Sequence, residues 1–186
     1  MKRLAIITVG KTHTGKSTFA RALEKELHNS FVMDQDNHAE FINTYYKKLP
    51  PKNGPNTLKH ALSKLIVDYA KENTDFHIIA SNANRTRTGR TYLLEEIYPK
   101  DMFVRILVHF DIPDDILRDR VKGSQRNTNI FRGPYSNFED VLNRQQEESS
   151  NDDVVEPEES EADHLFVIKH NDEVESIINE IVRISK

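Results

Sequence analysis

Short apolar runs alternate along the chain with segments that repeat their apolar residues every three or four positions. The runs are predicted to be buried strands over residues 4–9, 30–33, 76–80, 102–110 and 165–168. The periodic segments are predicted to be helices over residues 18–27, 38–48, 56–73, 92–98, 111–121, 138–148 and 172–185. Strands that alternate with helices are typical of a parallel sheet with right-handed crossovers. The pattern therefore predicts an α/β fold.

The first predicted strand leads directly into a glycine-containing loop and then into the first helix. The loop reads Gly10-Lys11-Thr12-His13-Thr14-Gly15-Lys16-Ser17 and fills every fixed position of the pattern G-x-x-x-x-G-K-[ST]. Gly10 and Gly15 permit positive φ, and the backbone N–H groups of the loop and helix start attract anions. Lys16 is expected to reach the β- and γ-phosphates of a nucleotide, and the Ser17 hydroxyl to ligate Mg²⁺. Residues 10–18, ending at Thr18, form the predicted nucleotide-binding loop.

Two carboxylates follow the second predicted strand. The run 30–33 leads into Asp34-Gln35-Asp36, and the carboxyl ends of parallel strands share the edge of the sheet where ligands bind. One interpretation is that both aspartates cap the next helix. For Asp34 we favour this capping role, and for Asp36 we favour contact with the substrate.

Three arginines follow the third predicted strand. Arg85, Arg87 and Arg90 lie where the next helix begins, and cations are unfavourable near a helix N-terminus. We therefore expect a nearby anion and interpret these residues as a substrate-binding cluster at the mouth of the site. The alternative is a solvated start of a helix.

A polar, basic loop follows the fourth predicted strand and its helix. Gly123 ends that helix, and the run from Gln125 to Pro134 carries two arginines and a glycine. A loop of this composition suits a lid that closes over a triphosphate. We predict that the lid spans residues 118–135.

The charge balance separates the body of the chain from one acidic segment. The net charge is −4, but residues 147–163 hold nine acidic groups and no Lys or Arg; without them 26 basic side chains face 21 acidic ones. The mildly basic body suits a phosphate binder and does not indicate a stable nucleic-acid partner. Residues 149–163 are predicted to form an exposed, mobile loop.

Length and composition favour one domain over residues 1–186, because a chain of this size can bury a good core. There is no cysteine, so no disulfide framework forms. No apolar stretch has the length of a signal peptide core or a membrane span. We expect a soluble, cytoplasmic protein without a membrane partner.

Two classes of phosphate-loop protein fit the sequence poorly. A GTPase needs an Asn-Lys-x-Asp guanine motif, which the chain lacks. A motor or transport ATPase usually has an apolar strand that ends in a metal-binding aspartate. Here the third strand ends at Ser81, and Asp111 after the fourth strand starts a helix.

Four stretches together resemble the small phosphate-loop kinases of the polynucleotide kinase, zeta toxin and chloramphenicol phosphotransferase group. They are the loop 10–17, the strand end at residues 33–36, the segment 81–85 and the arginine-bearing stretch 118–132. The resemblance implies a three-layer α/β sandwich, a P-loop NTPase of the nucleoside-kinase type, with five parallel strands ordered 2-3-1-4-5. It also implies that Asp36 is the general base for an acceptor hydroxyl, and that Arg120 and Arg126 are lid arginines on the phosphates of ATP.

The resemblance implies transfer of the γ-phosphoryl group from ATP, with Mg²⁺ as cofactor, to a hydroxyl of an unidentified acceptor. Phosphoryl transfer needs positioning and charge neutralisation, which Lys16, Mg²⁺ and the lid arginines would supply. Nucleosides, 5′-hydroxyl nucleic acids, sugars and antibiotics all remain open as acceptors. The alternative from another class is a non-catalytic ATP-binding switch, or an ATPase.

Overall fold

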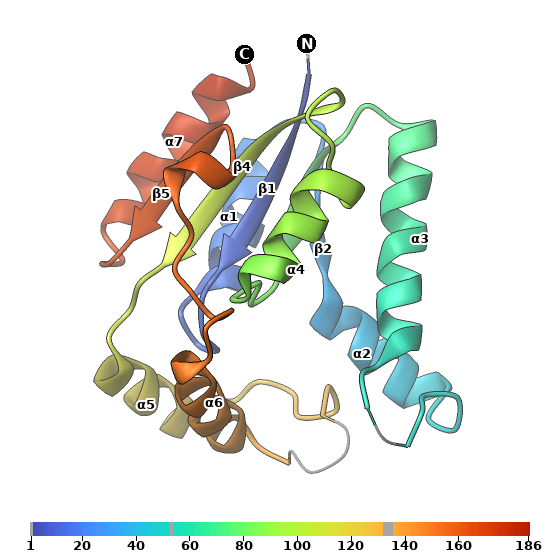
Figure 1. Ribbon diagram of the computed structural model, residues 1–186, viewed down its shortest axis with the longest axis vertical. Coiled ribbons are helices and arrows are strands. Elements are labelled where there is room, and N and C mark those ends of the chain that lie inside the picture. The colour runs from blue at the N-terminus through green and yellow to red at the C-terminus, as the bar shows by residue number, and fades with distance from the viewer. Residues whose placement is uncertain (1, 53, 132–135) are drawn as a thin grey trace.

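The computed structural model describes residues 2–52, 54–131 and 136–186, and Figure 1 shows its elements in order. The strands are β1 (Arg3–Val9), β2 (Ser30–Asp34), β3 (His77–Ser81), β4 (Phe103–Phe110) and β5 (His164–Ile168). The helices are α1 (Lys16–Glu26), α2 (Gln35–Tyr45), α3 (Thr57–Asn73), α4 (Arg87–Tyr92), α5 (Asp114–Lys122), α6 (Phe138–Glu147) and α7 (Glu173–Ile184). A π-helical turn, η1 (Leu93–Ile97), extends α4, and two 3₁₀ turns are η2 (Glu148–Ser150) and η3 (Glu159–Glu161).

The five strands form one parallel sheet in the order β2-β3-β1-β4-β5, which confirms the predicted topology. β1 lies at the centre, where Ile6 pairs in register with Ile79 of β3 and Ile106 of β4. All three of these side chains are fully buried. Strands buried on both faces read as continuous apolar runs, which is why the sequence pattern was so clear here.

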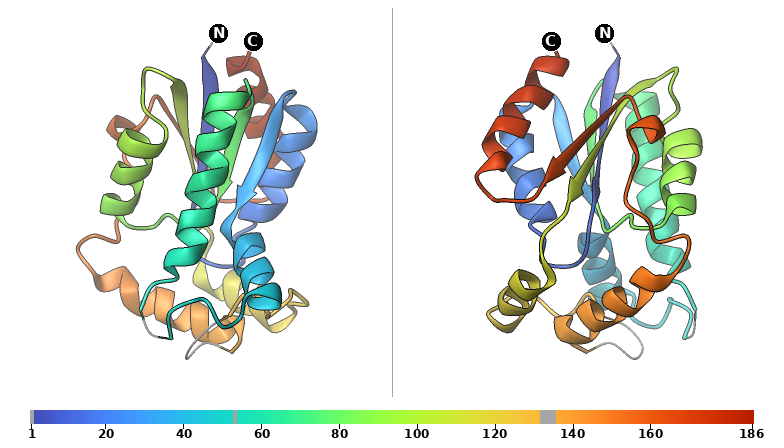
Figure 2. Two further views of the ribbon diagram at one scale, coloured as in Figure 1. Left: turned by 90° about the vertical axis from the view of Figure 1, so that its right-hand side faces the viewer. Right: turned by 60° about the vertical axis from the view of Figure 1, so that its left-hand side comes forward.

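Helices cover both faces of the sheet (Figure 2). Buried apolar side chains form two separate cores, one on each face. On one face, Phe19 and Leu23 of α1 and Ile178 of α7 pack with side chains of β1 and β4. On the other face, Val67 of α3 and Leu94 of η1 pack against the opposite sides of the same strands. The result is the three-layer sandwich that the sequence predicted.

Elements that do not cover the sheet gather beyond the carboxyl ends of its strands. Figure 1 shows α5, α6 and the end of α2 below that edge, and the two chain ends at the opposite edge. The segment after α5 reaches across to α2, where the Asn129 amide donates to the Thr44 hydroxyl (2.8 Å) and its backbone carbonyl accepts from Asn43 (2.7 Å). The described part of the predicted lid thus runs from the phosphate loop, which Arg120 and Ser124 contact, to α2. Residues 132–135 of the predicted lid lie outside the described residues.

Two helices begin earlier than the apolar periodicity indicated. α2 starts at Gln35 because the Asp34 carboxylate accepts from the Asp36 N–H as an N-cap (2.9 Å). α4 starts at Arg87 because the Thr86 hydroxyl accepts from the Gly89 N–H (3.2 Å). In both cases polar residues form the first turn, so the apolar pattern does not mark it.

The acidic segment is more structured than the expected mobile loop. It contains η2 and η3, and Val154 forms an isolated antiparallel bridge with Thr86. We call residues 148–161 the strap. Among the helices of the described residues, none combines the length and the apolar character needed to cross a membrane.

Candidate functional site

The loop between β1 and α1 has the backbone geometry of an anion-binding nest. Gly10 and Gly15 have φ values of 148° and 102°, and His13 also adopts positive φ, at 60°. A Cβ atom on Gly10 would lie 3.0 Å from the Phe110 carbonyl oxygen, so the strand packing as well as the dihedral angle requires glycine there. Left-handed residues in such a loop turn successive N–H groups toward one point, which favours an anion.

Positive charge gathers around this loop. The Lys16 ammonium donates to the Lys11 carbonyl and to the Thr14 hydroxyl (3.2 Å). Burial lowers the Lys16 pKa to about 7, against the opposing effect of the Asp36 carboxylate. Burial also lowers the His13 pKa to about 4, helped by Arg126, Lys16 and Arg120. Cations that disfavour one another's charge in this way are suited to a polyanionic ligand.

We expect nucleotide binding to take up a proton at mildly alkaline pH. At pH 8 a Lys16 amine with a pKa near 7 is mostly neutral, and adjacent phosphates raise its pKa by favouring the ammonium. At pH 6 the group is already protonated in both states. Calorimetry of Mg-ATP binding in buffers of different ionisation enthalpy should therefore show greater uptake at pH 8, approaching about one proton. Lys16→Arg keeps its charge at both pH values and should lose this difference; equal uptake by the wild type at both pH values would contradict the assignment.

Oxygen ligands lie together beside the start of α1. The Ser17 hydroxyl donates to the Asp34 carboxylate (3.1 Å) and lies 3.5 Å from the Ser81 hydroxyl oxygen. Asp34 is only 6% exposed, and burial raises the pKa of its carboxyl. No group of three or more His, Cys, Asp or Glu residues forms a metal cluster in the described part of the chain. A hydroxyl with one carboxylate nearby suits Mg²⁺, which keeps several waters and is otherwise held by substrate phosphates.

Asp34 therefore caps α2, as expected, and also lies beside the Ser17 hydroxyl, which the sequence did not predict. It is the last residue of β2 and pairs in register with Ser81, the last residue of β3. β3 lies next to β1, the strand that leads into the phosphate loop and α1. The Asp34 and Ser81 side chains therefore both lie near Ser17 at the start of α1. The cue in the sequence was that each residue directly follows a predicted strand.

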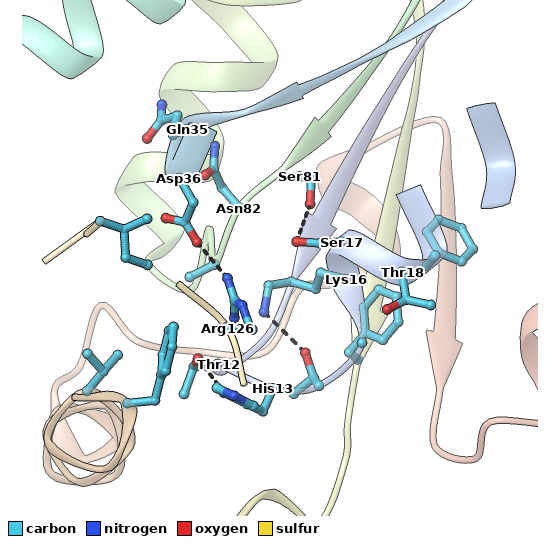
Figure 3. Close-up of a pocket in the computed structure, with 18 of the residues that line it drawn as sticks. Thr12, His13, Lys16, Ser17, Thr18, Gln35, Asp36, Ser81, Asn82 and Arg126 are labelled. Carbon is cyan, nitrogen blue, oxygen red and sulfur yellow. Dashed lines mark hydrogen bonds and ion pairs between the residues drawn. The ribbon is translucent and has the colours of Figure 1, made fainter. Parts of the chain in front are cut away.

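The Asp36 carboxylate faces the phosphate loop across the cavity and is paired with Arg126. In Figure 3 the Asp36 and Arg126 side chains point toward one another, and a guanidinium nitrogen lies 3.0 Å from a carboxylate oxygen. The Arg126 guanidinium also stacks over the Phe138 ring, 4.7 Å from its centroid. Asp36 and Arg126 both remain partly exposed, so a ligand can reach them.

Arg120 approaches the loop from α5. Its guanidinium donates to the His13 carbonyl (3.1 Å) and to the Asn171 side chain (3.1 Å). Arg120, Arg126, Asp36 and the loop residues 12–18 all line one cavity of about 1000 Å³. The structure thus gathers the predicted loop, carboxylate and lid arginines around one space large enough for a nucleotide and a second small molecule.

The arginines after β3 differ from the expected cluster at the mouth of this cavity. Arg90 is fully buried and forms a bidentate pair with Glu161 (2.7 and 2.8 Å). Arg87 pairs with Glu158, and Arg85 binds the Ser149 hydroxyl (2.6 Å). None of the three is among the described residues that line the cavity. In the structure these arginines pair with carboxylates of the strap, and their role in substrate binding stays a prediction.

Arg90→Met should destabilise the fold, because it leaves Glu161 and two strap carbonyls without their buried partner. We expect a loss of about 3–5 kcal/mol in the free energy of unfolding, measured by urea denaturation. Arg87→Met is the matched control, because its ion pair with Glu158 is exposed and contributes about 1 kcal/mol or less. An Arg90→Met protein with wild-type stability and lost acceptor use would restore the substrate-binding interpretation.

Several cavity residues gave no signal in the sequence. Gln145 of α6 is buried and accepts from the Thr12 N–H (2.7 Å). Phe138, at the start of the same helix, contacts His13 edge to face at 4.8 Å between ring centroids. Both lie outside any motif, and only the fold brings them to the site. Asn82, by contrast, belongs to the segment 81–85 that carries the family resemblance, and it lines the cavity beside Asp36 (Figure 3).

A family model described as an AAA domain (AAA_33) matches residues 6–148. None of the curated proteins matches the sequence. Among solved structures, the chain is similar to APS kinase from Mycobacterium tuberculosis in complex with AMPPNP and APS. The two share 15% identity over 99% of this chain and 98% of that chain, with a TM-score of 0.60.

Two further structures have the same fold. Kti12 from Chaetomium thermophilum, in complex with ADP-AlF3, is 15% identical over 95% of this chain and 96% of that chain (TM-score 0.60). Shikimate kinase from Bacteroides thetaiotaomicron is 14% identical over 98% of both chains (TM-score 0.54). The narrower resemblance to polynucleotide kinases and zeta toxins stays a prediction. With the phosphate loop, the sheet order and the family match in agreement, the chain belongs to the AAA domain family AAA_33, within the P-loop NTPase fold.

Proposed function

We propose that the protein is an ATP-dependent phosphotransferase that moves the γ-phosphoryl group of ATP to a hydroxyl of a small acceptor. The observation that carries the proposal is the Asp36 carboxylate, which faces the phosphate loop across the cavity and is paired with Arg126 at 3.0 Å. A site for ATP binding alone needs no carboxylate opposite the γ-phosphate. A site for transfer needs one to orient and deprotonate the acceptor hydroxyl.

The roles follow from the positions. The loop N–H groups and Lys16 would hold the phosphates, and Arg120 and Arg126 would neutralise charge on the group in transfer. Ser17, with Asp34 beside it, would hold Mg²⁺, which when bound neutralises charge on the phosphates. Asp36 would accept the proton of the acceptor hydroxyl while the oxygen of that hydroxyl attacks the γ-phosphorus and ADP leaves.

The residues that line the cavity on the side of Asp36 favour an acceptor with little negative charge. Residues 34–74 contain no arginine; Gln35, Asn56 and Lys59 from this range line the cavity together with Asp36. Asn82, which follows β3, lies next to Asp36 (Figure 3). Carboxamides donate to and accept from hydroxyls and bases, whereas a phosphorylated acceptor is better held by bidentate guanidinium groups. Because Arg85, Arg87 and Arg90 hold the strap, we infer that they do not supply those groups.

The decisive experiment incubates the protein with γ-labelled ATP and separate pools of nucleosides, oligonucleotides, nucleotides and sugars. We expect label on a neutral hydroxyl acceptor, with the nucleotide pool a poorer substrate. Tight ATP binding without transfer to any pool would favour the ATP-binding switch. Release of labelled phosphate without transfer would favour an ATPase.

A further inference from the structure

Gln145 makes an unusual contact with the phosphate loop. It lies near the end of α6, is 6% exposed, and its side-chain oxygen accepts from the Thr12 N–H at 2.7 Å. The N–H groups of such a loop are the donors that bind phosphate. Here one donor at the outer part of the loop is instead satisfied by a buried side chain from a distant helix.

The contact fixes the loop at its most constrained point. Thr12 precedes His13, whose φ of 60° lies in the left-handed region that residues other than glycine rarely adopt. Such a conformation persists only when surrounding contacts determine it. The His13 ring supplies some of them, through the Thr12 hydroxyl (2.9 Å), the Ser124 hydroxyl (2.8 Å) and the edge of Phe138. The backbone itself is held on both sides of this point: Arg120 donates to the His13 carbonyl, and Gln145 accepts from the Thr12 N–H.

The strap holds Gln145 in place. The Ser149 hydroxyl donates to the Gln145 carbonyl (2.9 Å) and accepts from Arg85 (2.6 Å), which also pairs with Glu148 (3.6 Å). Farther along, Arg90 fastens the strap to the body through Glu161. The arginines after β3 and the acidic segment, which the sequence presented as two unrelated features, therefore act together at the end of α6.

We propose that Gln145 is a positioning residue for the nucleotide phosphates: it holds the loop in its anion-binding conformation through the Thr12 N–H, and the Arg85–Ser149 contact keeps it there. The inference rests on the proposed function only as far as the phosphate loop binds a nucleotide. It does not depend on whether the phosphoryl group is transferred. A rigid loop pays less to become ordered when phosphates bind, so the contact raises affinity for ATP and not for adenosine.

The test compares Gln145→Met, which keeps the side-chain length and removes the acceptor, with Gln146→Met as the matched control. Gln146 is the next residue of α6 and accepts from Arg118, away from the loop (3.2 Å). For Gln145→Met we expect ATP affinity to fall about tenfold, the value for one buried donor left unpaired, with adenosine affinity unchanged. Amide hydrogen exchange should show the Thr12 N–H protected in the wild type and exposed in the variant.

Ser149→Ala provides a second variant at an exposed position, where folding is not in question. It removes the hydroxyl between Arg85 and Gln145, and we expect ATP affinity to fall about two- to threefold with adenosine affinity again unchanged. Wild-type ATP affinity in both variants would overturn the inference, as would an equal loss of ATP and adenosine affinity. If the wild type failed to bind ATP, both this inference and the proposed function would be wrong. If it bound ATP without transfer, only the proposed function would be wrong.

Discussion

Lys16→Ala should remove nearly all ATP-dependent activity while leaving the fold intact. The Lys16 ammonium donates to the Lys11 carbonyl and the Thr14 hydroxyl within the loop that we propose as the phosphate site. Removing a positioned charge from a group in transfer costs on the order of 10²- to 10³-fold in rate. Stability should not suffer, because burial already disfavours the ammonium, as its lowered pKa shows. Single-turnover transfer from γ-labelled ATP measures the first effect, and urea denaturation measures the second.

The control for this variant is Lys25→Ala, an exposed lysine in the last turn of the same helix. It changes the charge of the protein by the same amount far from the loop, so activity should stay within twofold of the wild type, roughly the effect of a distant surface charge. Wild-type activity of Lys16→Ala in every ATP-dependent assay would exclude the phosphate-loop interpretation. Loss of activity together with a large loss of stability would make Lys16 a structural residue.

The parts of the site that the sequence predicted are those set by local chemistry. The loop 10–17 has the geometry of an anion-binding nest because of its own glycines and backbone, so the motif alone locates it. Asp36 was predicted because a residue just after a parallel strand must lie at the ligand-binding edge. Local patterns do not determine the order of the strands in the sheet, so that order was predicted from the family resemblance.

The parts that the sequence did not predict depend on pairing between distant segments. Arg90 and Glu161 lie 71 residues apart. Arg90 was predicted to lie at the mouth of the site and Glu161 in an exposed loop, and nothing in the sequence indicated that they pair with one another. The contact between Ser17 and Asp34 depends on which strands are neighbours. Gln145 and Thr12 are joined across 133 residues by one buried hydrogen bond, which leaves no periodicity or motif in the sequence.

The position of Asp34 also changes how the two aspartates after β2 should be compared. If Asp34 only capped α2, Asp34→Asn would be a neutral control for Asp36, since a cap tolerates asparagine well. In the structure the Asp34 carboxylate accepts from the Ser17 hydroxyl, so its charge belongs to the expected Mg²⁺ environment. The control for Asp36 is therefore Asp75→Asn, an exposed residue before the start of β3, at the opposite edge of the sheet.

Asp36→Asn should separate transfer from nucleotide binding. The substitution keeps the size and shape of the side chain, and its amide oxygen can still accept from Arg126, so a packing effect is not expected. ATP is held mainly by the loop and Lys16, and its affinity should stay within a few-fold of the wild type. Loss of the general base should slow transfer to the acceptor by roughly 10²- to 10⁴-fold. Equilibrium ATP binding and single-turnover transfer, measured on the same preparation, give the two quantities, and Asp75→Asn should change neither.

Each other outcome assigns Asp36 a different role. Equal losses of ATP affinity and transfer would place its carboxylate with Asp34 in the environment of Mg²⁺, and the loss should then shrink as the Mg²⁺ concentration is raised. Tighter ATP binding with slower transfer would mean that Asp36 withholds Arg126 from the phosphates until the acceptor arrives, because the free guanidinium would then bind ATP. If neither quantity changed, no carboxylate on the acceptor side would be needed for transfer. The ATP-binding switch would then be the better account of a cavity whose other side carries the phosphate loop.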